Sequence, residues 1–366
     1  MLNSLEVEQF RNLTAARLEF VDGFNLIVGP NGAGKTTVLE AIHLLARGKS
    51  FRSSRSSNLV QKGQPLLRAR ADVQAIDGIR HALGVEKPVS GLRRLRLDGE
   101  ESKSAASIAS HLPIQLLLPN VGDLVFSGPA ARREFMDWGL FHVKQNYVEI
   151  ARRYRKLLKQ RNAWLRHSDL SRAQDDPWLD LITETGHIVN ELRESYLKDF
   201  SHYFSSVIER LDPQLACHFE YSTGGYEKNL PDTRKKMTEA LQREVKSGGT
   251  QIGPHRADLI IRLAEASASE TASRGQGKAI ASAAALAQAA LMKDRFQRAS
   301  LVLIDDIGAE FDSNHRSNLL QALAAIGSQV VATATDMLPE ALEAFEEDRI
   351  KVFHVEQGTV NVLQFD

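Results

Sequence analysis

The sequence predicts an α/β fold in which two α/β parts flank a helical insertion, and three observations support this prediction. A short apolar run at 24–28 ends in a glycine-rich loop, and an amphipathic helical pattern follows at 36–46. A second apolar run, at 301–304, ends in two aspartates. Between these features, strand-like alternation disappears over about 130–213 and helical periodicity replaces it. Because buried strands that feed loops and helices are typical of α/β proteins, the helical stretch is predicted to interrupt one α/β head.

The predicted domain organisation follows this change of pattern. Residues 1–128 form the N-terminal part of the head, 129–213 the helical insertion or arm, and 214–366 the C-terminal part of the head. The expected strands lie at 2–10, 16–20, 24–28, 114–118, 218–221, 259–263, 301–304, 329–333, 351–355 and 360–365, with further strands and a hairpin within 66–97, where Asp77-Gly78 and Ser90-Gly91 signal turns. The expected helices lie at 36–46, 132–164, 178–211, 234–246, 276–298 and 316–326.

Composition narrows the class of protein. The 366 residues are 43% hydrophobic, which is ample for a packed core. The 46 basic and 46 acidic residues cancel, so any DNA binding must come from a local basic patch. A single cysteine excludes an internal disulfide, which fits the reducing cytoplasm. The N-terminus lacks a signal-peptide pattern, and the most apolar helical stretch, 279–292, is too short and polar to span a bilayer. We therefore expect a cytoplasmic protein.

The glycine-rich loop matches the phosphate-binding pattern G-x-x-x-x-G-K-[ST] in full. Glycines let successive backbone N–H groups point at phosphate oxygens, and the helix that follows presents its positive N-terminus to the same oxygens. Lys35 is expected to reach the β and γ phosphates, and the Thr36 hydroxyl to bind Mg²⁺. An ordinary glycine-rich turn is the alternative, which the strand–loop–helix context disfavours. The residues expected to bind ATP here are Gly29, Pro30, Asn31, Gly32, Ala33, Gly34, Lys35, Thr36 and Thr37.

The strand at 301–304 carries the second part of the predicted site. A buried strand that ends in carboxylates is where a Walker B acid meets Mg²⁺. Asp305 is expected to order the Mg²⁺ shell, and Asp306 to polarise the attacking water. Two adjacent acids after a strand can also form a plain turn or helix cap, and the complete P-loop reduces the weight of that alternative.

The segment Ser273-Arg274-Gly275-Gln276 opens the next predicted helix. A serine at a helix N-cap, followed by glycine and exposed N–H groups, can bind a phosphate. By itself the segment is better explained as a simple helix cap. Its place shortly before the strand that ends at Asp305 makes a phosphate contact the stronger interpretation.

Together these segments resemble the ABC-type P-loop ATPase head of SMC proteins and, more closely, the RecF family of bacterial DNA replication and repair proteins. Besides the three motifs, the matching segments lie at 9–12, 38–42, 48–52, 129–137, 157–162 and 253–259. The most discriminating are the stretch Gly253-Pro254-His255-Arg256 and the short insertion, since SMC chains carry long coiled coils between their halves. The resemblance implies an SMC-head-like α/β fold with a helical insertion domain.

The resemblance also implies an activity and partners. It implies a weak, DNA-stimulated ATPase that acts mainly as a switch, with ATP and Mg²⁺ bound and no membrane partner. Two heads would pair head to tail, so that Ser273 and Gly275 of one subunit contact the γ-phosphate held by the other. The dimer would close on single- and double-stranded DNA at gap junctions. In the family this serves recombinational repair, replication and the SOS response, and it helps load RecA with RecR and RecO.

Some positions depart from the family pattern. Ala309 and Phe311 stand where serine and leucine are usual in the D-loop, which puts one contact across the dimer in doubt. Gly277 replaces a larger residue in the signature segment. Asp306 stands where most ABC ATPases have glutamate, so slow hydrolysis is expected. The absence of histidine in 333–336 argues against a transporter ATPase subunit. A nucleotide-gated scaffold without useful turnover remains a third hypothesis.

A basic stretch within 132–166 is the main candidate DNA surface. It holds ten basic and three acidic residues, a local excess of 10 − 3 = +7. Arg152, Lys156 and Lys159 fall on one helical face, with Arg166 two turns further on. Such a stripe suits phosphate contacts, whereas a solvated helix face is the plain alternative. Arg52 and Arg55, in a polar loop, are the second candidate.

Three other residues have two possible explanations each. Trp138 and Trp164 could stack on bases, although aromatic residues on amphipathic helices more often belong to the core. His255 is functional by resemblance and equally well explained as a structural histidine. No Cys/His cluster has metal-ligand spacing, so Mg²⁺ with the nucleotide is the only metal expected.

Overall fold

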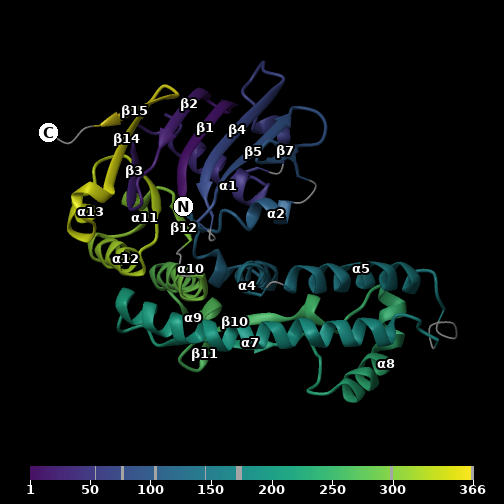
Figure 1. Cartoon of the computed structure of the whole chain (residues 1–366). Coiled ribbons are helices and arrows are strands. Elements are labelled where there is room, and N and C mark those ends of the chain that lie inside the picture. The colour runs from purple at the N-terminus through teal and green to yellow at the C-terminus, as the bar shows by residue number, and fades with distance from the viewer. Residues whose placement is uncertain are drawn as a thin grey trace. The chain divides into compact units, whose positions relative to one another are not determined.

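A computed structural model describes residues 1–53, 55–75, 78–102, 105–144, 146–169, 175–296 and 300–363 (Figure 1). The chain divides into two compact units. Unit 1 comprises Met1–Val121, Val207–Pro213 and Ser282–Asp366, and unit 2 comprises Gly122–Ser206 and Gln214–Ala281. This division groups 214–281 with the helical insertion. The three predicted ranges, 1–128, 129–213 and 214–366, remain a prediction of domain organisation.

Unit 1 contains a sheet that is parallel except at one edge. Its strand order is β15 (Thr359–Leu363), β14 (Ile350–Glu356), β3 (Phe24–Val28), β13 (Val330–Ala334), β12 (Leu301–Ile304) and β8 (Ile114–Leu117), with only β15 antiparallel to its neighbour. Every residue of β3, β12 and β13 is buried, as expected of continuous apolar runs in a parallel sheet covered on both faces. Figure 1 shows the purple N-terminal strand β3 beside the yellow C-terminal strand β14.

The second sheet of unit 1 is antiparallel. It runs in the order β2 (Leu13–Glu19), β1 (Leu2–Phe10), β4 (Leu66–Gln74), β5 (Arg80–Pro88), β6 (Arg94–Leu97) and β7 (Glu100–Glu101). Burial alternates along β4, which leaves one face in the core and one in solvent. Helix α1 (Lys35–Arg47) packs against β1, β4 and β5 of this sheet and against β13 of the other. Eleven of its thirteen residues are buried, and Gly48 ends it at φ 65°.

Unit 1 also contains the helices α2 (Ala105–Ala109), α11 (Ile307–Glu310), α12 (Ser313–Ile326) and α13 (Pro339–Ala344), with 3₁₀ turns η1 (Ser56–Asn58) and η3 (Glu347–Arg349). Among the described residues, no helix is long and apolar enough to cross a membrane.

Unit 2 is mainly helical. It contains α3 (Asp123–Phe126), α4 (Pro129–Val143), α5 (Tyr147–Leu165), α8 (Leu230–Ser247) and α9 (Ala268–Thr271), most of α7 (Leu179–Leu211) and the start of α10 (Arg274–Phe296). Unit 2 also has a small antiparallel sheet with the strand order β11 (Ala266–Ser267), β10 (Asp258–Leu263) and β9 (Cys217–Ser222). The 3₁₀ turn η2 (Pro254–Arg256) precedes β10. The rings of Phe200 and Phe204 on α7 pack edge-on against Phe219 of β9, which ties helix to sheet.

The expected single helix at 132–164 was wrong. The chain breaks there into α4 and α5, because Lys144 adopts an extended conformation, φ −120° and ψ 104°. Helix α8 begins at Leu230, four residues before the expected start. The side chain of Asn229 accepts a hydrogen bond from the N–H of Asp232 there, and a proline occupies the first turn. Three predicted features, the turn at Asp77 and the element ends at 298 and 365, fall outside the described residues.

Candidate nucleotide-binding site

The P-loop joins β3 to α1, as predicted, and its glycines are conformationally required. Gly29, Gly32 and Gly34 have φ values of 149°, 82° and 123°, which L side chains rarely adopt. A Cβ at Gly29 would also collide with the carbonyl oxygen of Val355 on β14. The loop can therefore wrap closely around a ligand only because these positions lack side chains.

Lys35, the first residue of α1, is positioned at this loop. Its ammonium donates hydrogen bonds to the carbonyl oxygens of Gly29, at 2.6 Å, and Pro30, at 3.1 Å. The residue is only 8% exposed. The first N–H groups of a helix lack partners within the helix, and the N-terminus carries partial positive charge. The loop thus combines a cation and helix-end donors, which is the donor set that phosphate oxygens require.

A hydrogen-bond network of four residues links the P-loop to the acidic strand end. Oδ1 of Asp305 accepts hydrogen bonds from the hydroxyls of Thr36, at 2.9 Å, and Thr333, at 2.8 Å. Thr333 Oγ1 in turn accepts a hydrogen bond from the N–H of Asp306, at 2.8 Å. Strand β13 lies between β3 and β12, so Thr333 near its end falls between the P-loop and the two aspartates. Sequence patterns did not predict Thr333, because none of them gave the strand order.

Asp306 follows in a left-handed backbone conformation, φ 55° and ψ 50°, at the start of α11. That conformation is uncommon for a residue other than glycine. The hydrogen bond from its N–H to Thr333 stabilises this turn after β12. The two aspartates therefore occupy different places: Asp305 faces Thr36, whereas the backbone turns at Asp306.

Asn12, in the turn between β1 and β2, stabilises the P-loop through two side-chain hydrogen bonds. Its Oδ1 accepts a hydrogen bond from the Thr37 hydroxyl at 3.0 Å, and its Nδ2 donates to the carbonyl oxygen of Gly32 at 3.1 Å. The N–H of Gly358, in the turn between β14 and β15, donates to the carbonyl oxygen of Ala33 at 3.2 Å. This support was not predicted, although Asn12 lies in the matching segment 9–12.

A buried ion pair fixes the middle of α1. Glu40 has a fully buried side chain and accepts hydrogen bonds from Arg11, at 2.5 Å to Nε and 2.7 Å to a terminal nitrogen. The Ser50 hydroxyl also donates to Glu40, and Ser50 Oγ accepts from the N–H of Arg52 at 2.9 Å. Three matching segments, 9–12, 38–42 and 48–52, therefore meet in one network, which also positions the loop that carries the exposed Arg52.

The signature segment in unit 2 forms a capping box at the start of α10. The N–H of Ser273 donates to Oε1 of Gln276 at 2.9 Å, and the N–H of Gln276 donates to the Ser273 hydroxyl oxygen at 3.2 Å. Ser273, Arg274 and Gly275 are exposed. The segment is thus a well-formed helix N-terminus that remains open to a ligand.

The departure from the family pattern at Gly277 has a structural explanation. A Cβ there would collide with the ring of Phe126 on α3. A Cβ added at Gly122 would also lie 3.3 Å from this ring. The aromatic side chain thus occupies space beside α10 that a larger residue at 277 would need.

Arg316 on α12 stabilises the D-loop, residues 308–312, through hydrogen bonds. One terminal nitrogen of Arg316 donates to the carbonyl oxygen of Phe311 at 3.2 Å, and Nε donates to Glu340 on α13 at 3.1 Å. The side-chain hydrogen bond from Arg316 lowers the pKa of Glu340. Asp312 caps α12 by accepting from the N–H of His315 at 2.9 Å. This segment can therefore keep its backbone shape despite the replacements at Ala309 and Phe311.

The candidate DNA stripe lies on the exposed face of α5. Arg152, Lys156, Lys159 and Arg166 are exposed, whereas the opposite face buries Tyr154, Leu157, Arg161 and Leu165. The ten basic residues counted within 132–166 are therefore not all available. Arg132 pairs with Asp258 at 2.8 Å in a largely buried contact, and Arg161 is 0% exposed. Both count toward the excess of positive charge in the sequence, but burial and pairing withdraw them from a ligand.

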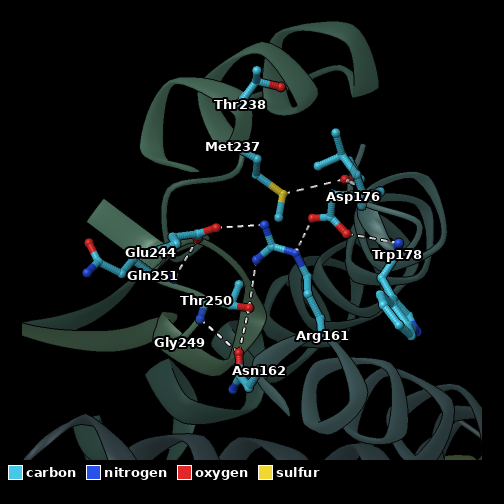
Figure 2. A network of polar contacts seen from close by, with 12 residues as sticks. Arg161, Asn162, Asp176, Trp178, Met237, Thr238, Glu244, Gly249, Thr250 and Gln251 are labelled. Atoms are coloured by element: carbon cyan, nitrogen blue, oxygen red, sulfur yellow. Dashed lines mark hydrogen bonds and ion pairs between the residues drawn. The ribbon is translucent and has the colours of Figure 1, made fainter. Parts of the chain in front are cut away.

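Arg161 joins four segments of unit 2 in a polar network, the Arg161 junction (Figure 2). Its guanidinium contacts Asp176 at 2.7 Å, Glu244 at 2.6 Å and the Thr250 hydroxyl at 2.7 Å. Asn162 Oδ1 accepts hydrogen bonds from the N–H and the hydroxyl of Thr250. Burial by itself lowers the pKa of Arg161, but the hydrogen bond and charge of Glu244, with Asp176, raise it overall. The network therefore keeps a charged guanidinium in the interior.

His255, in the discriminating segment, belongs to the same junction. The Tyr154 hydroxyl lies 2.8 Å from its Nδ1, and its Nε2 lies 2.9 Å from the carbonyl oxygen of Thr250. Since a carbonyl only accepts, Nε2 carries the proton and Nδ1 accepts from the tyrosine. Burial, above all, lowers the pKa of His255 to about 4, so the ring is neutral near pH 7. Of the two explanations, the structure favours a satisfied structural histidine.

Two further expectations concern aromatic residues and metals. The ring of Trp164 packs 5.8 Å from that of Trp178 and against the buried pair Leu165 and Leu241, as expected for a core residue. Trp138 stacks on Phe141 with centroids 5.5 Å apart. In the described part of the chain, no group of three or more His, Cys, Asp or Glu residues could hold a metal ion.

The chain is similar to known proteins over its whole length. The family model described as RecF/RecN/SMC N terminal domain matches residues 1–361. The DNA replication and repair protein RecF of Shewanella loihica is 35% identical over 364 residues, which cover 99% of both chains. The protein of the same name from Azotobacter vinelandii is 37% identical over 362 residues, which cover 98% of both chains.

Solved structures share the fold. A structure of the recombination mediator protein RecF-ATP in the RecFOR pathway has a TM-score of 0.86 and 26% identity, and the match covers 99% of this chain and 97% of the other. The Smc head bound to the C-winged helix domain of ScpA has a TM-score of 0.58 at 16% identity, covering 100% and 97%, which shows the fold alone. The predicted ABC-type, SMC-head-like ATPase fold is confirmed, and the chain belongs to the RecF family.

Proposed function

We propose that this chain is an ATP-dependent DNA-binding protein of DNA replication and repair, in which ATP binding operates a switch. The observation that carries the proposal is the hydrogen-bonded set Thr36, Asp305 and Thr333 beside a complete P-loop. The relatives' name, DNA replication and repair protein RecF, supports the process. The ATP in a solved RecF structure supports the nucleotide.

The residues around the loop fit a magnesium nucleotide. Lys35 would take up phosphate oxygens in place of the carbonyl oxygens of Gly29 and Pro30, which it now contacts. The hydroxyl of Thr36 and the carboxylate of Asp305, 2.9 Å apart, are hard oxygen donors of the kind that Mg²⁺ prefers. When bound, the ion would neutralise charge on the phosphates. Thr333 would hold Asp305 in place through its hydroxyl.

Turnover in this proposal is slow. Asp306 would polarise the attacking water, and it is one methylene shorter than the glutamate usual in ABC ATPases. Its backbone has a left-handed conformation, and its N–H donates to the Thr333 hydroxyl oxygen. A slow ATPase that DNA stimulates suits a switch better than a motor. A scaffold without useful turnover stays as the second hypothesis, because the same shortening of Asp306 favours it.

Assembly completes the proposed site. Ser273 and Gly275 of one chain would meet the nucleotide of a second chain, since the exposed capping box offers backbone donors at a helix N-terminus. The dimer would close on single- or double-stranded DNA at gaps and help load RecA, with RecR and RecO as partners. The family resemblance supports these partners.

Sedimentation with and without ATP, Mg²⁺ and gapped DNA tests the proposal. We expect the chain to dimerise only with ATP and Mg²⁺, and the dimer to sediment with DNA. Lys35→Ala should weaken ATP binding about ten- to a hundredfold and suppress ATP-driven pairing to the same extent, because removing a charge-assisted hydrogen bond to phosphate costs about 1.5–3 kcal/mol. Ser273→Ala should bind ATP as a monomer and fail to pair. If Lys35→Ala binds ATP normally, the site assignment is wrong. If Ser273→Ala pairs normally, the contribution in trans is wrong.

A further inference from the structure

The hairpin between β5 and β6 presents apolar side chains at its tip. Leu92 is 91% exposed and Val89 is 44% exposed. Gly91 between them has φ 108°, so the turn depends on a residue without a side chain. Single exposed leucines are common on protein surfaces, so these two apolar residues gain meaning only together with the charge around them.

The hairpin is also positively charged. Residues 86–96 contain four basic side chains, Lys87, Arg93, Arg94 and Arg96, and one acid, Glu86. The local net charge is 4 − 1 = +3 in a chain whose total is zero. Arg94 is mostly exposed and lies 3.7 Å from Glu86. An apolar tip on a basic stem is complementary to an anionic polymer that offers flat apolar faces, which is a nucleic acid.

Two cations of the stem, Lys87 and Arg93, repel one another. Burial lowers the pKa of Lys87, and the neighbouring charge of Arg93 lowers it further. Two cations held close together gain free energy when an anion binds between them. Because the apolar tip favours a nucleic acid, the anion expected between these cations is a phosphate group.

The hairpin is also fastened to the P-loop helix. Arg93 donates a hydrogen bond to the carbonyl oxygen of Gly48, the C-cap of α1. A Cβ at Gly48 would lie 3.1 Å from the Arg93 guanidinium, so this side chain closely approaches the end of the helix. The chain continues from Gly48 into the loop that carries the exposed Arg52 and Arg55. The hairpin and this basic loop therefore adjoin one another at the end of α1.

We propose that the β5–β6 tip is a wedge for unstacked bases at a DNA end or gap. Leu92 and Val89 would pack against the last base pair or insert beside it, and Lys87, Arg93 and Arg94 would hold the flanking phosphates. The inference rests on the proposed function and extends it. Leu92 and Val89 would be the residues that distinguish a junction from continuous duplex. Since the wedge is attached to α1, the nucleotide and the junction engage two ends of one helix.

The test compares Leu92→Ser with Ile79→Ser in the full-length chain. Ile79 is 57% exposed just before the opposite end of β5, so it controls for the loss of an exposed aliphatic side chain. Both variants should fold, because neither side chain is buried. Affinity for gapped and for continuous duplex DNA is measured with ATP and Mg²⁺, with 2-aminopurine at the gap edge to report unstacking.

We expect Leu92→Ser to bind gapped DNA about five- to tenfold more weakly and to leave continuous duplex binding unchanged. The rise in 2-aminopurine fluorescence should also disappear. Ile79→Ser should match the unaltered chain in both respects. If Leu92→Ser binds and unstacks gapped DNA like the unaltered chain, the wedge is wrong while the proposed function stands. If the unaltered chain binds no DNA at all, both the proposed function and the wedge are wrong.

Discussion

The P-loop of unit 1 and the Arg161 junction of unit 2 both carry segments that match the family, yet their cations are held differently. Lys35, itself buried, contacts two neutral carbonyl oxygens, at 2.6 and 3.1 Å, in a loop whose residues 30–32 are exposed. Arg161 contacts two buried carboxylates and a hydroxyl, in Asp176, Glu244 and Thr250. A phosphate can displace the first set of partners, because carbonyls are weak competitors for an ammonium. No ligand can displace the second set without leaving buried charges unpaired.

This difference separates binding motifs from architectural motifs within one family pattern. Where a charged side chain has exchangeable partners, its matching segment serves a ligand. Where the partners are buried and charged, the segment serves the fold. Four predictions test this distinction, from the largest expected effect to the smallest.

Removing the guanidinium of Arg161 should have the largest effect. Arg161→Met leaves Asp176 and Glu244 buried without their cation, which costs about 3–5 kcal/mol of unfolding free energy. Urea unfolding, followed through the fluorescence of Trp164 and Trp178, measures the decrease. Arg152→Met, on the exposed face of the same helix, is the control and should stay within about 0.5 kcal/mol. Equal stability of the two variants would contradict the architectural assignment.

Acidification should weaken the junction through His255. Its folded-state pKa is about 4, below the ordinary value of 6.5, because the ring is buried. Between these values the unfolded chain binds more protons than the folded chain, so unfolding free energy falls as pH drops from about 6.5 to about 4. The expected decrease from this group is about 3 kcal/mol. His255→Gln should flatten the slope in urea titrations at several pH values, and the exposed-site control His167→Gln should not.

Thr333→Val tests the binding side of the comparison. The change removes a hydroxyl that donates to Asp305 and accepts from the N–H of Asp306, with little change in shape. We expect ATP turnover to fall about tenfold, equivalent to about 1.4 kcal/mol, while ATP affinity changes less. Thr335→Val, two residues further on and exposed, is the matched control. A steady-state assay in which both variants match the unaltered chain would rule out a role for Thr333.

The exposed face of α5 should show the smallest effect per residue. Replacing Arg152, Lys156 and Lys159 together by glutamine should leave stability unchanged and weaken DNA binding. The plot of log affinity against log salt should become flatter by about 0.9 for each duplex phosphate that the variant no longer neutralises. DNA affinity measured from 50 to 200 mM salt tests this. An unaltered slope would assign the stripe to an ordinary solvated face.

Local signals made much of the fold and site predictable from sequence. The P-loop has its own residue spacing, and the central strands of the parallel sheet are continuous apolar runs such as 301–304. The start of α8 was placed too late because the cap at Asn229 precedes the amphipathic pattern. The break between α4 and α5 was missed because residues on both sides of Lys144 keep helical periodicity.

The remainder depends on contacts between segments distant in sequence. Thr333 becomes part of the site only because β13 enters between β3 and β12, and strand order has no local signature. Arg161 was counted in the local excess of positive charge, although its spacing from Tyr154 and Leu157 places it on the buried face of α5. Its buried partner Glu244 lies 83 residues away, so the pairing itself has no local signature. Pattern reasoning recognises a cation, but the surrounding fold determines whether it is available.

The position of β3 between β13 and β14 also has a consequence for synthesis. Both neighbours of the P-loop strand come from residues 330–356, about three hundred residues after the P-loop itself. At a synthesis rate of about 5–20 residues per second, the P-loop would wait about 15–60 s for its flanking strands. The intervening unit 2 can fold during that interval from its own segments. The ability to bind a nucleotide is thus acquired last. A nascent chain, or one truncated before β13 and β14, would be unable to bind ATP.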